Sequence, residues 1–184
     1  MSFIGIGAGL QGTGGTAGAI AGGLGVALGI YTAASISGGH VNPAVTAGFL
    51  IQGRLANSII GNLVMFLIYF GSQLLGAFVG AALSYCIYFD KIEYLSLEDT
   101  TCLFATCPTK EYENGIAIML IDQILGTFIL VRDHTRVLPG SNCFKVNTVL
   151  VTTDPDNGLS PGLAPLLIGF SATAASLSYG DNAG

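Results

Sequence analysis

The residues with the clearest capacity for chemistry form one short segment, Ser37–Thr46, which reads Ser-Gly-Gly-His-Val-Asn-Pro-Ala-Val-Thr. Asn42 is a favourable helix N-cap and Pro43 suits the first helical position, so a helix is predicted to begin here. Such a start leaves backbone N–H groups unpaired and presents the positive end of the helix dipole. Gly38 and Gly39 permit an irregular backbone before it, whose carbonyl groups can line a path for a polar solute.

Two interpretations of this segment follow from its spacing alone. In the first, the helix starts at membrane depth, where free polar backbone is tolerated only along a cavity or inside protein. In the second, it is an aqueous loop followed by a surface helix, because Asn-Pro is a common helix start. Both predict a helix that ends by about Arg54 and is separate from any helix before Ser37.

A second glycine pattern has a structural interpretation. Gly7, Gly9 and Gly12 form a GxGxxG, but a dinucleotide site needs a preceding strand and an acid about 20 residues later. The next acid in this chain is Asp90, so close packing between membrane helices is predicted for these glycines. No second His or Cys stands at metal-ligand spacing from His40, and no nucleophile elbow is present. Neither a metal site nor a hydrolytic enzyme is therefore predicted.

Charge is scarce and unevenly distributed. Of 184 residues, 51% are hydrophobic and 9% are charged, against about 25% charged in an average soluble domain. Six Lys and Arg with a net charge of -5 exclude a phosphate-binding nucleic-acid surface. Four runs are almost free of charge: Met1–Gly53, Leu55–Phe89, Asn114–Val131 and Asn157–Gly180. Because a soluble fold could not cover four such runs, they predict an all-α, polytopic membrane protein.

Apolar stretches define the elements that position the segment. The predicted spans are Ala17–Ile36, Ser58–Tyr88, Asn114–Val131 and Leu163–Tyr179. A helix from Pro43 to about Gln52 would measure roughly 15 Å, which is half a membrane. Asp90–Glu113 is predicted to be a polar loop, since it holds six of the eleven acids. Asp122 is the one acid inside a predicted span.

Ser37–Thr46 resembles the first pore half-helix motif of the aquaporins, the major intrinsic proteins. Shorter likenesses to the same family occur in other parts of the chain: Gly23–Ala27, Ser72–Ala77, Asp122–Thr127, Thr153–Pro155, Asn157–Leu159 and Pro161–Pro165. The likenesses from Asp122 onward are closest to the aquaglyceroporin form of the family.

The resemblance implies a partial aquaporin fold over residues 1–184, a helical bundle with one re-entrant pore half-helix. It implies a membrane channel for passive, single-file passage of water, glycerol and other small neutral solutes, which needs no cofactor. The implied pore-lining residues are Gly38, Gly39, His40, Val41, Asn42, Pro43 and Ala44. His40 is expected either to face the pore or simply to anchor the loop, and Asp122 to have a structural role. The implied surroundings are a lipid bilayer, the plasma membrane and a homo-oligomer, a tetramer in the family.

The chain also departs from the family it resembles, which has six spans and two half-helices. Most of the first span is absent, and Phe3–Gly9 resembles its tail; Arg132–Thr148 resembles nothing in the family; the chain ends before a second Asn-Pro-Ala motif. An incomplete chain is therefore expected, and the alternative function is a non-conducting fragment that associates with full-length subunits. A secondary transporter is the weakest alternative, because Asp122 is its one candidate coupling residue.

The topology in the membrane and the state of the cysteines can be predicted from charge and from the family resemblance. The positive-inside rule places Arg54 in the cytosol, and the resemblance gives the same side. The loop with Cys102 and Cys107 is then extracellular, where a disulfide is chemically allowed, although two free thiols remain an open alternative. Cys86 is expected to pack against apolar side chains in a helix.

Overall fold

The structure is a computed structural model that describes residues 2–11, 14–105, 107, 115–131, 160 and 162–183. All regular secondary structure in this part of the chain is helical, which confirms the predicted all-α fold. The segment 132–148 and the loop likenesses within 153–159 lie outside the described residues.

The helices are α1 (Ser2–Leu10), α2 (Gly14–Ser37), α3 (Pro43–Ile51), α4 (Ile59–Ile87), α5 (Phe89–Glu93), α6 (Leu97–Phe104), α7 (Ile116–Val131) and α9 (Ala164–Ala183). Four of the helices, α2, α4, α7 and α9, occupy the places of the four predicted spans. The predicted polar loop after α4 contains two short helices, α5 and α6. Ser96 explains α6, because its hydroxyl caps the helix by accepting from the Asp99 backbone N–H at 3.0 Å.

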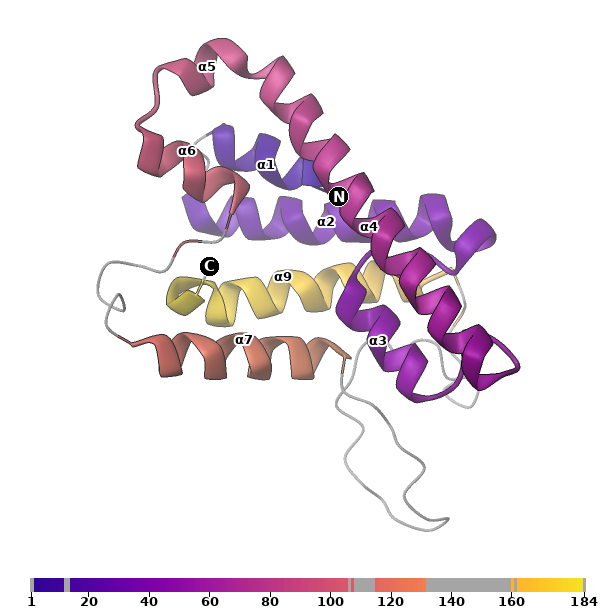
Figure 1. The fold of residues 1–184 in the computed structure, drawn as a ribbon. Helices are drawn as coiled ribbons and strands as arrows, with labels where there is room; N and C mark the ends of the chain where they lie inside the picture. The colour runs from indigo at the N-terminus through magenta and orange to yellow at the C-terminus, as the bar shows by residue number, and fades with distance from the viewer. Residues whose placement is uncertain are drawn as a thin grey trace.

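The helices form a layered bundle (Figure 1). In it α2, α9 and α7 lie side by side, α1 packs against α2 and α4, and α4 runs obliquely across the bundle with α3 against it. At 29 residues, α4 is about 44 Å long, and it separates the α3 end of the molecule from the α5–α6 end. Arg54, just after α3, and the segment with Cys102 therefore lie near opposite ends of α4, the arrangement that the predicted topology requires.

The contact between α2 and α9 depends on two glycines. A Cβ atom at Gly169 would lie 2.5 Å from the carbonyl oxygen of Gly23 and 2.8 Å from Cβ of Ala27. A Cβ at Gly23 would in turn overlap Thr173 Oγ1 and the Gly169 carbonyl. Real Cβ atoms do not approach backbone atoms this closely, so the two helix axes can be this near only because both positions lack a side chain.

The same use of small residues explains the GxGxxG pattern. A Cβ at Gly7 would lie 3.5 Å from the Tyr88 hydroxyl oxygen, and one at Gly9 would lie 3.0 Å from Leu103. Packing of α1 against the end of α4 and against α6 is thereby confirmed for these two glycines. Gly12 lies outside the described residues.

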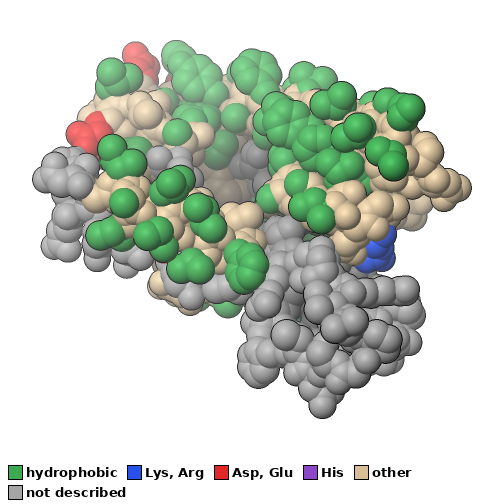
Figure 2. All heavy atoms as spheres, turned by 60° about the horizontal axis from the view of Figure 1, so that its bottom comes forward, with side chains coloured by type: hydrophobic (Ala, Val, Ile, Leu, Met, Phe, Trp, Pro, Cys, Tyr) green, Lys and Arg blue, Asp and Glu red, His purple; other side chains and the backbone are tan. Residues whose placement is uncertain are grey.

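Many large apolar side chains are exposed on the outer surface, which is unlike a soluble protein. The buried hydrophobic core is small, and Ile30, Val45 and Ile168 form its centre. Figure 2 shows hydrophobic side chains across one face, with acidic side chains at one end and a basic one at the other. Two helices, Gly15–Ser37 and Ile59–Ile87, are long and apolar enough to cross a membrane, and Ile116–Phe128 and Ala164–Ser178 are shorter apolar helices.

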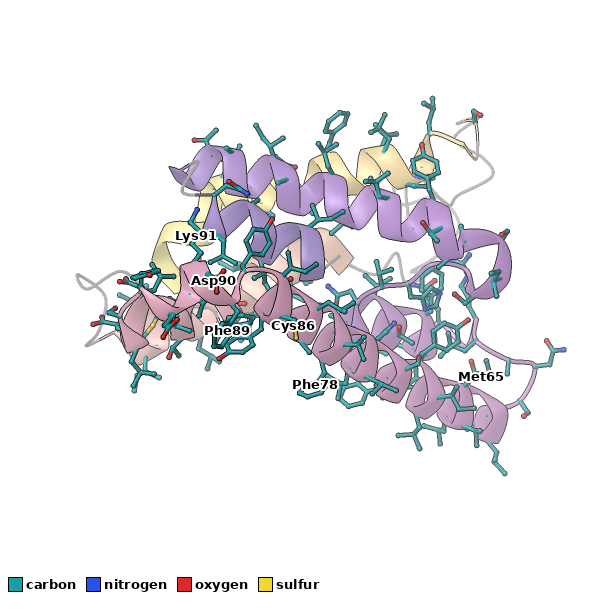
Figure 3. The ribbon with its side chains drawn as sticks, turned by 90° about the horizontal axis from the view of Figure 1, so that it is seen from above. Met65, Phe78, Cys86, Phe89, Asp90 and Lys91 are labelled. Carbon is teal, nitrogen blue, oxygen red and sulfur yellow. A yellow bond between two sulfur atoms is a disulfide. The ribbon has the colours of Figure 1, made fainter. Side chains whose placement is uncertain are left out.

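The outer face of α4 shows this exposure most clearly. Phe78 is 72% exposed and projects from α4 on the side away from α2 (Figure 3). Cys86 on the same helix is also exposed. Cys86 therefore lies in a helix, as predicted, but the predicted packing against apolar side chains is wrong among the described residues, because its side chain is on an exposed face of α4.

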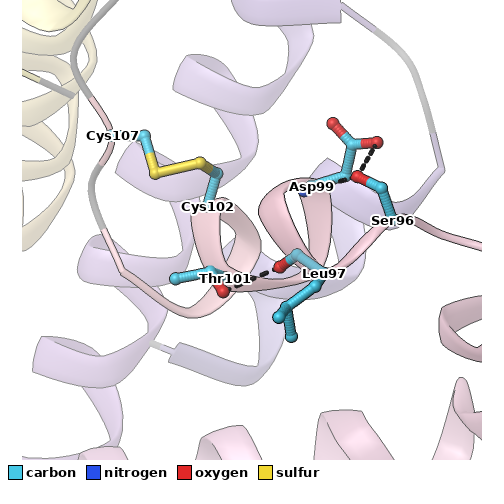
Figure 4. Close-up of a disulfide and its surroundings, with 6 residues drawn as sticks. All are labelled: Ser96, Leu97, Asp99, Thr101, Cys102 and Cys107. Atoms are coloured by element: carbon cyan, nitrogen blue, oxygen red, sulfur yellow. Dashed lines mark hydrogen bonds between the residues drawn. A yellow bond between two sulfur atoms is a disulfide. The ribbon is translucent and has the colours of Figure 1, made fainter. Parts of the chain in front are cut away.

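The two remaining described cysteines are joined. Cys102 at the end of α6 and Cys107 just beyond it form a disulfide (Figure 4), which decides between the two open alternatives. Next to the disulfide, Phe104 and Phe89 both contact the ring of Tyr85, at 6.2 and 5.7 Å between ring centroids. These contacts fold α5 and α6 back onto the end of α4.

Candidate functional site

The candidate site begins where α2 stops. Gly38 and Gly39 adopt φ angles of 77° and 65°, in the left-handed region that favours glycine. The backbone at Gly39 also lies directly on α2, since a Cβ there would be 3.0 Å from the carbonyl oxygen of Ile30. The chain therefore turns back sharply along α2, and a helix running unbroken through this segment is excluded.

Val41 shares this conformation, with φ 44°. For a β-branched residue this is a strained backbone that persists only when its surroundings enforce it. The side chain packs against the core of Ile30, Val45 and Ile168, which supplies that enforcement. The irregular loop before α3 is thus held by packing as well as by its glycines.

The start of α3 confirms the predicted N-cap. Asn42 has extended backbone angles, and its side-chain Oδ1 accepts the Ala44 backbone N–H at 2.8 Å. Pro43 occupies the first turn, where its missing N–H costs nothing. Among the described residues, no acceptor takes the two protons of Asn42 Nδ2. This amide can therefore donate hydrogen bonds to a solute at the positive end of α3.

His40 is held between two aromatic rings. Its imidazole stacks on Phe49 from α3 at 4.5 Å and 9° between ring planes, and on Tyr69 from α4 at 4.9 Å and 28°. Tyr69 also donates from its hydroxyl to the carbonyl of Ser37 at 2.6 Å. The side chain of His40 thus anchors the loop that links α2 to α3, because its ring is held between α3 and α4. The loop-anchor interpretation expects this arrangement.

A single buried hydroxyl joins the three parts of the site. Thr46 on α3 is fully buried, and its Oγ1 accepts from Gln73 Nε2 of α4 at 2.9 Å. The same oxygen lies 3.2 Å from His40 Nδ1 and donates to the backbone carbonyl of Asn42 at 3.2 Å. Thr46 is therefore the hub through which α4 and the loop hold the first turn of α3.

All seven predicted site residues, Gly38, Gly39, His40, Val41, Asn42, Pro43 and Ala44, lie together in this loop and first turn. The chemically important residues that sequence reasoning missed are the ones behind them: Thr46, Phe49, Tyr69 and Gln73. A signal for Gln73 was available, because it is a polar amide within the charge-free run of α4, where a buried polar group needs a partner.

Asp122, the acid expected to be structural, is buried on α7.

Known proteins share this sequence pattern. The profile of one family, Major intrinsic protein, matches residues 3–184. The chain is 31% identical to Aquaporin-3 of Milnesium tardigradum over 90% of its own length and 47% of that protein's. It is 30% identical to human Aquaporin-10 over 90% of its length and 50% of that protein's. Against a probable glycerol uptake facilitator protein of Thermotoga maritima the identity is 32%, over 88% and 58% of the two chains.

The matching region is almost the whole of this chain, although the chain spans about half the length of the curated relatives it matches. It contains the half-helix start, the spans around it and the apolar outer surface described above. The chain is an integral membrane protein, and it belongs to the major intrinsic protein family.

Proposed function

We propose that this protein contributes to a channel for the passive passage of water, glycerol and other small neutral solutes. The observation that carries the proposal is the α3 start, where Asn42 Nδ2, which has no acceptor among the described residues, lies at the positive end of a half-helix set inside an apolar bundle. The names of the relatives, two aquaporins and a probable glycerol uptake facilitator, support the same function.

The chemistry of the site fits neutral solutes that carry hydroxyl groups. Carbonyl groups of the irregular loop, at Gly38 and Gly39, would accept hydrogen bonds from hydroxyls, while Asn42 Nδ2 would donate to their oxygens. The positive end of the α3 dipole would repel cations at the same point. A site of this kind lowers the free energy needed to remove water from the solute, and it would do so without a cofactor.

The first test is solute flux. Residues 1–184 contain one Asn-Pro-Ala triplet, and the family resemblance implies that a pore needs two half-helices that meet. We therefore expect vesicles with the 184-residue chain alone to show glycerol permeability near background. A chimera that continues after Gly184 with the second half of the Thermotoga maritima relative, and omits Arg132–Thr148, should raise glycerol flux well above that level.

Stopped-flow light scattering of vesicles with equal amounts of inserted protein would measure both. A folded chimera that remains impermeable to glycerol and to water would contradict the proposed function. Robust flux through the 184-residue chain would instead contradict the requirement for a second half-helix, and with it the alternative of a non-conducting fragment.

A second test uses Asn42→Asp in the conducting chimera. Aspartate caps helices as well as asparagine does, so α3 should still form. The variant loses both N–H donors and gains a negative charge at the dipole's positive end, which weakens the barrier to cations. We expect glycerol flux to fall by about tenfold or more, which is the effect of losing one hydrogen bond to the solute. We also expect a sodium or proton leak to appear. An unchanged flux and no leak would exclude Asn42 from the solute path.

We further propose that residues 1–184 fold as one domain, in a homo-tetramer within the plasma membrane. The resemblance to the family is the ground for the tetramer and the location. The exposed apolar faces of α4 and α2 support a bilayer or neighbouring subunits around the chain, because side chains such as Leu67 and Leu28 are 66% and 55% exposed.

A further inference from the structure

The segment that links α3 to α4 is wrapped around one side chain, that of Asn62 in the first turn of α4. Asn62 is 7% exposed. Its Oδ1 accepts the backbone N–H groups of Leu55 at 2.9 Å and Ala56 at 3.1 Å. Its Nδ2 donates to the backbone carbonyls of Ala56 at 2.7 Å and Ser58 at 2.8 Å. All four hydrogen-bonding positions of the amide are therefore used on the linking segment, residues 55–58.

Asparagine suits this position better than any close analogue. Aspartate would place a second oxygen against the carbonyls of Ala56 and Ser58, where two donors are needed. Leucine has a similar shape but would leave three backbone groups in a partly buried site without the partner that Asn62 supplies: the N–H groups of Leu55 and Ala56 and the carbonyl of Ala56. The neighbouring Gly61 adds to the fit, since a Cβ there would lie 2.8 Å from Ser58 Oγ and 3.1 Å from Ala56 Cβ. The linking segment thus rests on the α4 backbone itself.

The linking segment begins where α3 ends, so what holds it also holds α3. Gly53 closes α3 with φ 65°, and the Arg54 backbone N–H donates to the carbonyl of Phe49 at 3.0 Å. The guanidinium of Arg54 lies over the Phe49 ring, 4.8 Å from its centroid. The first turn of α3 is attached to α4 through Thr46 and Gln73. The last turn has its attachment through the segment that Asn62 binds.

We propose that Asn62 is a positioning residue that fixes the C-terminal end of the α3 half-helix against α4. It acts through the linking segment and touches no part of the solute path proposed above. Two attachments, one at each end of α3, define the tilt of the half-helix, and a loss of the Asn62 attachment leaves α3 free to pivot about Thr46. Asn57 offers a matched control, because it is an exposed asparagine in the same segment.

Proteolysis of the full chain in detergent tests the attachment directly. Arg54 is the only Lys or Arg before Lys91, so trypsin cleavage after it gives a distinctive N-terminal fragment. We expect Asn62→Asp to increase cleavage after Arg54 by about tenfold, since the segment opens locally, and to leave cleavage after Lys91 unchanged. Asn57→Asp should match the wild type at both sites. Equal increases at Arg54 and Lys91 would indicate general destabilisation and overturn the proposal, and so would no increase at Arg54.

A distance measurement tests whether α3 itself moves. Nitroxide labels on Ile51→Cys at the end of α3 and Leu75→Cys on α4, both at exposed positions, would be read by pulsed electron resonance with Cys86 and Cys143 replaced by alanine. We expect a broadened distance distribution for Asn62→Asp and an unchanged one for Asn57→Asp. An unchanged distribution for Asn62→Asp would confine its role to the linking segment and overturn the positioning role. If Asn62→Asp cannot be purified as folded protein, Asn62→Ala replaces it in the proteolysis and distance measurements, with the same expected and contradicting results.

The consequence for transport rests on the proposed function. In the conducting chimera, a pivoting α3 should change the ratio of glycerol to water permeability in Asn62→Asp and not in Asn57→Asp, because a lower amount of folded protein scales both permeabilities equally. A chimera that does not conduct would contradict the proposed function and leave the cleavage and distance results to decide on Asn62. A conducting chimera with an unchanged ratio would contradict the effect on the half-helix.

Discussion

Replacing Gly23 by alanine is expected to separate α2 from α9 and to remove most of the folded protein. The added methyl group would overlap the carbonyl of Gly169, which is backbone and cannot move aside without shifting a whole helix. It would also overlap Thr173 Oγ1. Overpacking against side chains costs about 1–3 kcal/mol, and a clash with backbone lies at or beyond the upper end of that range. Such a cost is a large part of the stability of a typical domain.

Gly22 provides the matched control for this variant. It is the adjacent residue on the same helix, and a Cβ there would have no atom within 4 Å apart from its own helix backbone and chain neighbours. Gly22→Ala should therefore be neutral or stabilising, because alanine favours a helix by about 1 kcal/mol over glycine. Size-exclusion chromatography in detergent and the midpoint of thermal unfolding by circular dichroism would compare the two variants.

Two further variants localise the effect. Thr173→Ala combined with Gly23→Ala should not restore folding, since the Gly169 carbonyl remains in the way. Gly169→Ala should reproduce the defect from the other helix, because its Cβ would lie 2.5 Å from the Gly23 carbonyl. Equal behaviour of Gly22→Ala and Gly23→Ala would show that α2 and α9 do not cross at these glycines.

Sequence patterns alone predict the elements of this fold better than their contacts. The Asn42–Pro43 start of α3 was predictable because a cap is a local property of consecutive residues. The spans were predictable because the absence of charge over 20 or more residues is also a local signal. In α2, by contrast, small residues recur along the helix, and the sequence does not say that Gly23 rather than Gly22 faces α9.

The candidate site divides in the same way. The seven loop and first-turn residues were found because they are contiguous, whereas their supports lie further along α3 and on α4. Gln73 reaches Thr46 across 27 positions in the chain, and the stack on His40 needs a ring from α3 and another from α4. Such pairings depend on the angle between helices, which no single segment of sequence specifies. The α6 helix was missed for another reason. Ser96 and Asp99 at its start form a local capping pattern, but the acidic composition of the segment led to the prediction of a loop.

Thr46→Val should have the largest effect among substitutions that conserve volume in the site. Valine fills the same space but has no hydroxyl, so the buried Gln73 Nε2 loses its partner and His40 Nδ1 loses the oxygen 3.2 Å away. An unpaired, fully buried group costs about 1–3 kcal/mol, and less is lost at half-buried groups such as these two, so we expect a loss of about 2–3 kcal/mol in the free energy of unfolding. Because Thr46 joins the loop and α4 to the first turn of α3, that turn should detach before the rest of the bundle unfolds.

Thr46→Ser separates the hydroxyl from the methyl group. Serine keeps all three contacts of Oγ1 and removes one buried methyl group, for which a cost of about 1 kcal/mol is expected. Thermal unfolding of the full chain in detergent, followed by circular dichroism, should therefore rank the wild type above Thr46→Ser and place Thr46→Val well below both. Hydrogen exchange of the 42–46 backbone should accelerate in the valine variant alone, because the N-cap depends on the attachment to α4. If serine and valine destabilise equally, the methyl group and not the hydroxyl network holds α3, and the hub described for Thr46 is wrong.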